Sequence, residues 1–329
     1  EPWRVLRTRL RRQGRFRGSD EGGTPFGFFT GATGITIYRG DGWPQRYRGN
    51  VFVGDVANNL VFRARADTDS LERKIHRVDH QSEFLASRDI WFRPVQFSNG
   101  PDGMLYVMDM YRGLIEGAAF LPSEFLSFVN PVGGNNRGRI YRIVPRDRTH
   151  NPFPRLGELS SLELVSLLEH PNGWHRDTAS RLLYSRQDQD VIKPLKKRAL
   201  ESVLPLGRIT ALYALQGMRQ LDCSLVQNAL NDLHPEVRVH ALRLAETFSD
   251  SQALESRLEQ LASDPSPRVR FQLALSLGAF RPDVKHPILL QMIDAERHLP
   301  WMRFALLCSI HDTGAHVFKS LVNNMGLLH

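Results

Sequence analysis

One arginine recurs through the second half of the chain at a nearly constant interval. Successive copies are separated by 32, 30, 32 and 33 residues, and they are Arg176, Arg208, Arg238, Arg270 and Arg303. Each copy lies in an apolar segment with the period of an amphipathic helix, and a second helical segment, such as Ser161 to His170, lies between successive copies. A two-helix unit that recurs about every 32 residues predicts an α-solenoid, in which neighbouring repeats stack and bury a continuous core.

Stacked repeats would place these arginines in a single row, which allows two interpretations. The row could bind phosphate groups, or each arginine could bond to the neighbouring repeat. The first 150 residues contain 23 Lys and Arg against 16 Asp and Glu, whereas the remainder contains 20 against 19. The net charge of +8 therefore comes mainly from the seven arginines between Arg4 and Arg17. Because the repeats are almost neutral, we favour the structural role for the arginines and expect no nucleic-acid partner. A protein partner on the repeats is a separate expectation, since solenoids offer extended binding surfaces.

The first half of the chain has the period of β-strands. Short β-branched and aromatic runs alternate with Gly, Asn and Asp turns, and they are Gly34 to Gly40, Asn50 to Val56, Asn59 to Ala66, Lys74 to Val78, Arg93 to Ser98, Met104 to Met110 and Gly138 to Val144. Closely spaced strands of this kind predict antiparallel sheets. The runs form two groups with the layout of propeller blades, whereas a closed propeller needs roughly four to eight blades. We therefore expect only the last blades of a propeller.

The predicted fold class is thus multidomain, all-β followed by all-α: partial β-propeller blades and then a HEAT-type α-solenoid. Residues 1–25 form a basic segment of a truncated propeller, residues 26–148 the last blades, residues 149–158 a proline-rich linker and residues 159–329 the helical repeats. The chain starts at Glu1 rather than Met, and we expect a fragment of a longer product. It shows neither a signal peptide nor an apolar run of the roughly 18–20 residues that span a bilayer.

The sequence predicts no metal site. Cys223 and Cys308 are too few and too far apart for a thiolate site and are expected to act as small apolar groups. His76 and His80 are four residues apart but have no third ligand at a useful spacing, so we interpret them as surface histidines. The chain also contains no CxxCH pattern, which excludes a haem attachment site of that type within it.

Three stretches of the first half carry a resemblance to a known family. They are Ile35 to Arg63, Ser87 to Glu116 and Asn136 to Pro145, and the pattern WFRP…NGPDG.LYV.DMYR is the most specific part. The chain resembles the planctomycete and verrucomicrobial membrane-bound dehydrogenase family, in which a propeller similar to quinoprotein glucose/sorbosone dehydrogenases precedes HEAT-like repeats. The resemblance implies an extracytoplasmic enzyme that oxidises a sugar or related alcohol, with pyrroloquinoline quinone as cofactor and a cytochrome c as electron acceptor.

Candidate site residues gather near the strand run that ends at Met110. Asp109 and Arg112 are the predicted catalytic residues, and Arg93, Asn99 and Tyr111 are the predicted cofactor-binding residues. A carboxylate, a phenol and a guanidinium within four residues suit a sugar or an anionic cofactor, because arginine offers a rigid fork of donors. The alternative is structural: a salt bridge between blade and loop, and a simple turn at Asn99 to Gly103.

Two functions remain open from the sequence. The first is the C-terminal part of a quinoprotein-like dehydrogenase whose HEAT repeats serve as an interaction or structural module. The second is a non-catalytic scaffold, since propellers and solenoids both offer extended binding surfaces and a fold alone does not specify a function.

Overall fold

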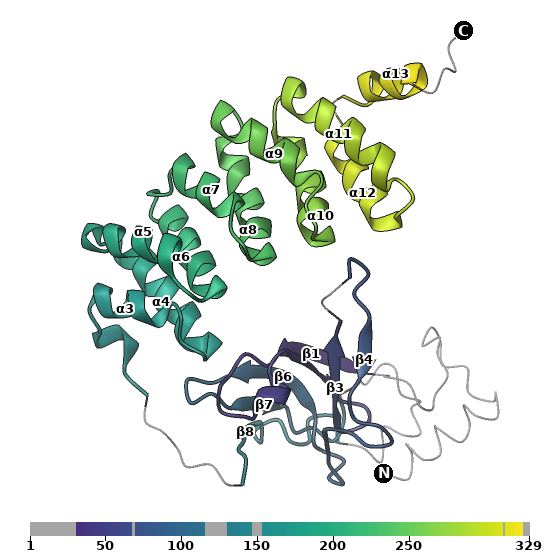
Figure 1. Ribbon diagram of the computed structural model, residues 1–329. Helices are drawn as coiled ribbons and strands as arrows, with labels where there is room; N and C mark the ends of the chain where they lie inside the picture. The colour runs from purple at the N-terminus through teal and green to yellow at the C-terminus, as the bar shows by residue number, and fades with distance from the viewer. Residues whose placement is uncertain (1–30, 68–69, 116–129, 147–152, 312, 325–329) are drawn as a thin grey trace, which may run out of the picture. The chain divides into compact units, whose positions relative to one another are not determined.

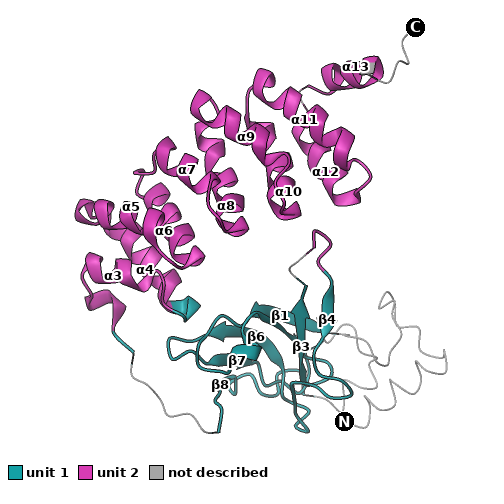
Figure 2. Cartoon of the chain, in the orientation of Figure 1, with its two compact units in different colours: residues 1–67, 74–154, 171–174 teal, residues 68–73, 155–170, 175–329 magenta. Residues whose placement is uncertain are grey.

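The computed structural model describes residues 31–67, 70–115, 130–146, 153–311 and 313–324. The chain divides into two compact units, of which unit 1 comprises residues 1–67, 74–154 and 171–174 and unit 2 comprises residues 68–73, 155–170 and 175–329 (Figures 1 and 2). Unit 1 contains the strands and unit 2 contains the helical repeats. The predicted basic segment, residues 1–25, lies outside the described residues.

Unit 1 contains two antiparallel sheets, as the strand pattern predicts. The first has the order β1-β2-β3-β4, with β5 paired to β3, and the second has the order β6-β7-β8. The strands are β1 (Ala32–Ile37), β2 (Asn50–Asp55), β3 (Leu60–Ala66), β4 (Ile75–Arg77), β5 (Leu85–Ala86), β6 (Pro94–Asn99), β7 (Leu105–Asp109) and β8 (Arg139–Ile143). The sequence pattern missed β5, because two residues are too few to show a period of two. The assignment of these sheets to the last blades of a propeller stays a prediction.

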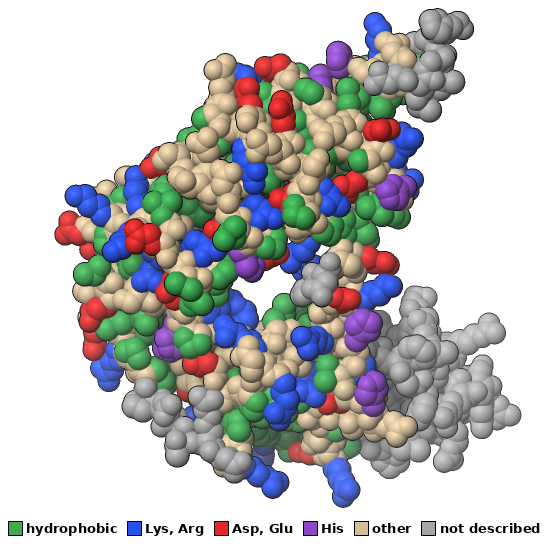
Figure 3. Space-filling model, viewed as in Figure 1, with side chains coloured by type: hydrophobic (Ala, Val, Ile, Leu, Met, Phe, Trp, Pro, Cys, Tyr) green, Lys and Arg blue, Asp and Glu red, His purple; other side chains and the backbone are tan. Residues whose placement is uncertain are grey.

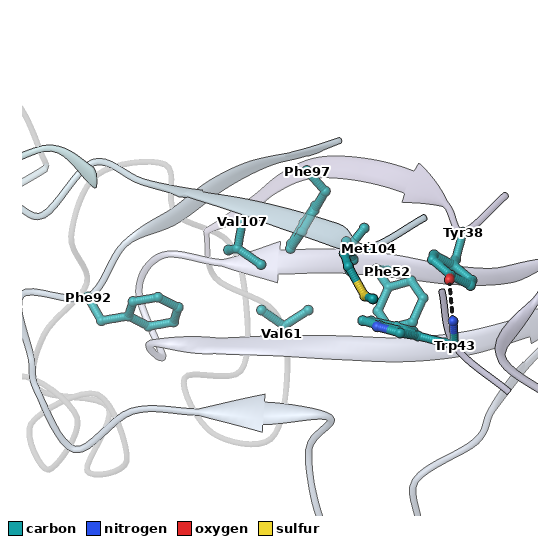
Figure 4. Close-up of a cluster of buried hydrophobic side chains, with 9 residues drawn as sticks. Tyr38, Trp43, Phe52, Val61, Phe92, Phe97, Met104 and Val107 are labelled. Carbon is teal, nitrogen blue, oxygen red and sulfur yellow. Dashed lines mark hydrogen bonds between the residues drawn. The ribbon is translucent and has the colours of Figure 1, made fainter. Parts of the chain in front are cut away.

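A cluster of aromatic and aliphatic side chains forms the core of unit 1 (Figure 4). Phe52 and Val61 come from the first sheet, and Phe97 and Val107 come from the second, so the same core holds both sheets together. The Tyr38 hydroxyl is buried in this core and donates to the carbonyl of Gly103 at 2.6 Å. It also accepts from the Trp43 amide at 2.8 Å (Figure 4), which satisfies the buried polar group in both of its roles.

The turn between β6 and β7 requires its final glycine. Gly103 has φ +77°, and a Cβ there would lie 2.2 Å from a carboxylate oxygen of Asp41. Asp102 stabilises the same turn, since it accepts from the Met104 amide at 3.1 Å and from the Tyr106 hydroxyl at 3.0 Å. These contacts agree with the structural interpretation of the Asn99 to Gly103 segment.

Unit 2 is a stack of helix pairs, as the arginine repeat predicts. Its helices are α3 (Ser161–Leu167), α4 (Gly173–Arg186), α5 (Ile192–Glu201), α6 (Pro205–Gly217), α7 (Cys223–Leu230), α8 (Pro235–Ala245), α9 (Glu255–Leu261), α10 (Pro267–Ser276), α11 (Pro282–Glu296), α12 (Pro300–Ser309) and α13 (Gly314–Asn324). From α3 to α12, odd-numbered helices form one layer, and the even-numbered helices, which carry the recurring arginines, form the inner layer of the curve (Figure 1). No helix in the described ranges combines the length and apolar character needed to cross a bilayer.

Asp222 caps the start of α7 and makes the stability of this region depend on pH. Its carboxylate accepts from the Leu225 amide at 3.0 Å and from the Lys196 ammonium at 2.7 Å. The hydrogen bonds from Lys196 and Ser224 lower the pKa of Asp222 to about 2. A carboxylate with a lowered folded pKa stabilises the fold above its unfolded pKa, near 4, and loses that contribution as the pH falls towards its folded value.

We therefore expect the stability advantage of the wild type over Asp222→Asn to shrink between about pH 4 and pH 2. The Lys196 and Asp222 side chains are 38% and 44% exposed, so solvent screening keeps the advantage below about 1 kcal/mol. Urea unfolding followed by circular dichroism at several pH values measures it. A difference that stays constant from pH 6 to pH 2.5 would show that the Lys196 pair contributes nothing.

Candidate functional site

The structure brings together four of the five predicted site residues. Arg93 immediately precedes β6, and Asp109 ends the neighbouring strand β7, with Tyr111 and Arg112 just beyond it. Asn99 lies at the opposite end of β6, which at about 3.3 Å per residue places it roughly 20 Å from Arg93. Asn99 is therefore not part of the same cluster.

Arg93 is fully buried, and its guanidinium bonds to the main chain. Its Nη1 donates to the carbonyl of Val56 at 2.6 Å, and its Nη2 donates to the carbonyl of Gly113 at 2.8 Å. The Nε donates to the carbonyl of Arg112 at 2.8 Å. Arg93 thus ties the segment after β2 to the segment after β7, and it positions the backbone that carries Tyr111 and Arg112.

Asp109 is 2% exposed and uses only one carboxylate oxygen for hydrogen bonds within the described residues. Its Oδ1 accepts from the amides of Arg93 at 2.7 Å and Tyr111 at 2.8 Å. Its Oδ2 is buried and has no hydrogen-bond partner there. An unsatisfied buried acceptor is costly, by about 1–3 kcal/mol, and requires an explanation. A donor from a bound molecule would provide one.

Tyr111 adopts an uncommon backbone conformation beside a cation. Its φ is +49°, in the left-handed region that non-glycine residues seldom occupy. The Arg139 guanidinium carbon lies 3.5 Å from the centroid of the Tyr111 ring. A hydrogen bond with Asp89 raises the pKa of the Tyr111 phenol. The Arg112 side chain donates to the carbonyl of Val132 at 3.2 Å.

Asn99 links two strands rather than facing that cluster. Its Oδ1 accepts from the Arg39 amide at 2.8 Å, and its Nδ2 donates to the carbonyl of Ile37 at 3.0 Å. The predicted cofactor set of Arg93, Asn99 and Tyr111 therefore does not fit a single quinone pocket, because its members are separated and the first two bond to the main chain. Nor do three His, Cys, Asp or Glu side chains gather as metal ligands within the described ranges.

Three of the recurring arginines of unit 2 bond to the following repeat. Arg208 donates through Nε and Nη2 to Asp232 at 2.6 and 2.8 Å, and Arg238 donates in the same way to Asp264, at 2.8 Å for both bonds. The Arg270 Nε bonds to Glu296. The predicted structural role is confirmed for these three arginines. Their carboxylate partners were not identified from the sequence, although they follow the arginines at spacings of 24 or 26 residues.

The inner layer contains a hollow of about 400 Å³ between α4 and α6. Tyr184 stands at this hollow and is 61% exposed. None of its lining residues was predicted as a site residue, and they are Asp177, Ser180, Arg181, Tyr184, Tyr213, Ala214 and Gly217. Their spacing of three and four residues along two helices places them on one face, a signal that the sequence did contain.

A polar network continues from this hollow along the inner layer. The Tyr213 hydroxyl lies 3.0 Å from Nδ1 of His240. The Arg243 Nε donates to Gln272 at 2.8 Å, and Gln272 donates to Ser276 at 3.0 Å. Burial, followed by the neighbouring Arg243 charge, lowers the pKa of His240, while burial raises the pKa of Tyr213. Both rings are therefore neutral near pH 7, and the network presents mostly neutral donors and acceptors.

A second hollow, of about 510 Å³, lies on the odd-numbered layer between α3 and α5. It is bordered by the exposed aliphatic side chains of Leu162 and Val203 and by the Glu169–Arg198 ion pair, whose atoms are 2.7 Å apart. The inner hollow differs because it presents two tyrosines, Tyr184 and Tyr213, and tyrosine is enriched among the residues that dominate the binding energy of protein interfaces. The inner face is therefore the better candidate binding surface.

Two family models match the chain. A model of a domain of unknown function, DUF7133, matches residues 4–147, and a model of HEAT repeats matches residues 224–307. The second match identifies the repeats from α7 to α12 as HEAT repeats and confirms this part of the sequence interpretation. No curated protein matches the chain.

Proposed function

We propose that this chain is a protein-interaction module whose helical repeats bind a partner on the inner face of α4, α6 and α8. The HEAT match supports an interaction or structural role for the repeats. The observation that carries the proposal is the inner hollow, where the exposed Tyr184 stands beside Arg181 and Asp177. Tyrosine and arginine at a concave site are typical anchors of protein interfaces.

The charge distribution favours a protein partner over a nucleic acid. Figure 3 shows acidic and basic side chains interspersed over the visible face of the repeats. Three recurring arginines, which could otherwise bind phosphate, are paired with the carboxylates of Asp232, Asp264 and Glu296. A nucleic-acid surface instead needs unpaired positive charge along one face.

Site-specific photo-cross-linking tests this proposal. Tyr184 is replaced by photoreactive p-benzoylphenylalanine in the full chain. The labelled chain is then irradiated in an extract of the cells in which the protein naturally occurs. Matched chains carry the same group at Leu162, in the odd-layer hollow, and at the exposed Asn228 of α7. We expect a discrete protein adduct at position 184 and none at position 228. An adduct only at position 162, or equal labelling at all three positions, would contradict the proposal.

A second candidate function is binding of a hydroxylated ligand, such as a sugar, by unit 1. It is supported by the buried Oδ2 of Asp109, which has no partner among the described residues. A sugar hydroxyl could donate to this oxygen and satisfy it. Oxidation of that sugar with pyrroloquinoline quinone and a cytochrome c, in an extracytoplasmic enzyme, rests on the sequence resemblance alone.

Substituting Asp109→Asn separates ligand binding from folding. Asparagine keeps the acceptor for the Arg93 and Tyr111 amides, so we expect the free energy of unfolding to be unchanged or raised by up to about 1 kcal/mol. Saturable binding of glucose or sorbosone, measured by isothermal titration calorimetry, should be lost in the variant. Absence of sugar binding by the wild type, or unchanged affinity in the variant, would remove this candidate.

A further inference from the structure

The last even-numbered helix exposes two apolar positions whose equivalents in α6 and α8 are buried. In α8, Val239 and Leu242 follow Arg238 by one and four residues and are 4% and 0% exposed. In α12, Phe304 and Leu307 follow Arg303 at the same offsets and are 59% and 57% exposed. These residues form the continuation of the stacking interface that joins the earlier repeats.

Arg303, the recurring arginine of α12, also has no acidic partner among the described residues. Arg238 is paired with Asp264 of the following repeat, at 2.8 Å. Arg303 is exposed and forms no ion pair or side-chain hydrogen bond with any residue that the structure describes. The helix α13 contains no acidic residue, and residues 325–329 contain none. The acidic residue between α12 and α13, Asp312, lies outside the described residues. Among the described residues, no carboxylate therefore neutralises the charge of Arg303.

We propose that Arg303, Phe304 and Leu307, together called the end surface, bind an amphipathic helix pair that carries a carboxylate at the end of its first helix. Such a ligand would reproduce the contact that α11 and α12 make with α10, where Glu296 ends the first helix and pairs with Arg270. The apolar side chains supply the buried area, and the charge selects an acidic partner. A second copy docked symmetrically fits less well, because a symmetric contact brings each patch against itself and would oppose two Arg303 cations.

The chain itself provides the probe for this surface. The probe is a fluorescein-labelled synthetic peptide with the sequence of residues 282–309, cross-linked within each helix so that circular dichroism verifies its helicity. Its own Arg303 and Phe304 are replaced by Ser, which prevents the peptide from associating with itself. Fluorescence anisotropy measures its binding to the full 329-residue chain.

We expect saturable binding that weakens at least tenfold in the chain variants Arg303→Glu and Phe304→Ser. A peptide that carries Glu296→Lys should restore binding to Arg303→Glu, which a general loss of folding would not allow. Lys193→Glu, an equal charge reversal on the exposed surface of α5, should leave binding unchanged. No saturable binding, or equal losses in the Arg303 and Lys193 variants, would overturn the proposal. So would self-association of the wild-type chain in sedimentation velocity that Phe304→Ser abolishes, because the occupant would then be a second copy.

Discussion

Replacing Arg238 by alanine is expected to lower the free energy of unfolding of the helical unit by about 3–5 kcal/mol. The Arg238 and Asp264 side chains are only 9% and 4% exposed, so the substitution leaves a buried carboxylate without its cation. Arg238 also donates to the carbonyl of Asp232 at 2.7 Å, and that bond is lost as well. Urea unfolding followed by helical circular dichroism measures the effect.

Two further variants separate the ion pair from general disruption. The double variant Arg238→Met with Asp264→Leu removes both partners. It should lower the free energy of unfolding less than Arg238→Ala alone, because no buried charge remains unpaired. Arg155→Ala breaks a pair whose side chains are 84% and 72% exposed, and it should change stability by less than about 0.5 kcal/mol. Equal losses from Arg155→Ala and Arg238→Ala would contradict the role assigned to the row of arginines.

Replacing Arg93 by methionine is expected to destabilise unit 1 by at least about 3 kcal/mol, because three main-chain carbonyls lose their buried donor at about 1–3 kcal/mol each. Tryptophan fluorescence of the full chain during urea unfolding reports this loss, since Trp43 lies in the core of unit 1.

Arg112→Ala is the matched control for Arg93. The backbone of Arg112, not its side chain, accepts the bond from Arg93, and the side chain adds a bond to Val132. We expect this substitution to lower the free energy of unfolding by less than about 1 kcal/mol. If Arg93→Met instead unfolded like the wild type and lost sugar binding, Arg93 would be a ligand-binding residue and the structural assignment would be wrong.

The helical repeats could be predicted from the sequence because their information is periodic. Each arginine recurs with an apolar residue three positions later, and a helix of that period must bury one face. The carboxylates of Asp232, Asp264 and Glu296 were harder to recognise. They lie at helix ends or in loops, comprise two Asp and one Glu, and meet their arginines only after the repeats stack.

The candidate site in unit 1 could be predicted only in part. The local sequence correctly places Asp109, Tyr111 and Arg112 just at or beyond the end of a strand, and Arg93 meets them because β6 pairs with β7. The sequence does not show which hydrogen-bond partner each polar side-chain atom has in the folded protein. The Arg93 guanidinium bonds to carbonyls that belong to other segments, and a carbonyl is present at every residue whatever its side chain.

Hydrogen–deuterium exchange of the full chain, alone and with the partner captured at position 184, tests whether the inner face of the repeats is the binding surface. If the inner face binds that partner, amides of α4, α6 and α8 should exchange more slowly in the complex, while those of α3, α5 and α7 keep their rates. Slower exchange confined to α3 and α5, or to the strands of unit 1, would contradict an inner-face binding module.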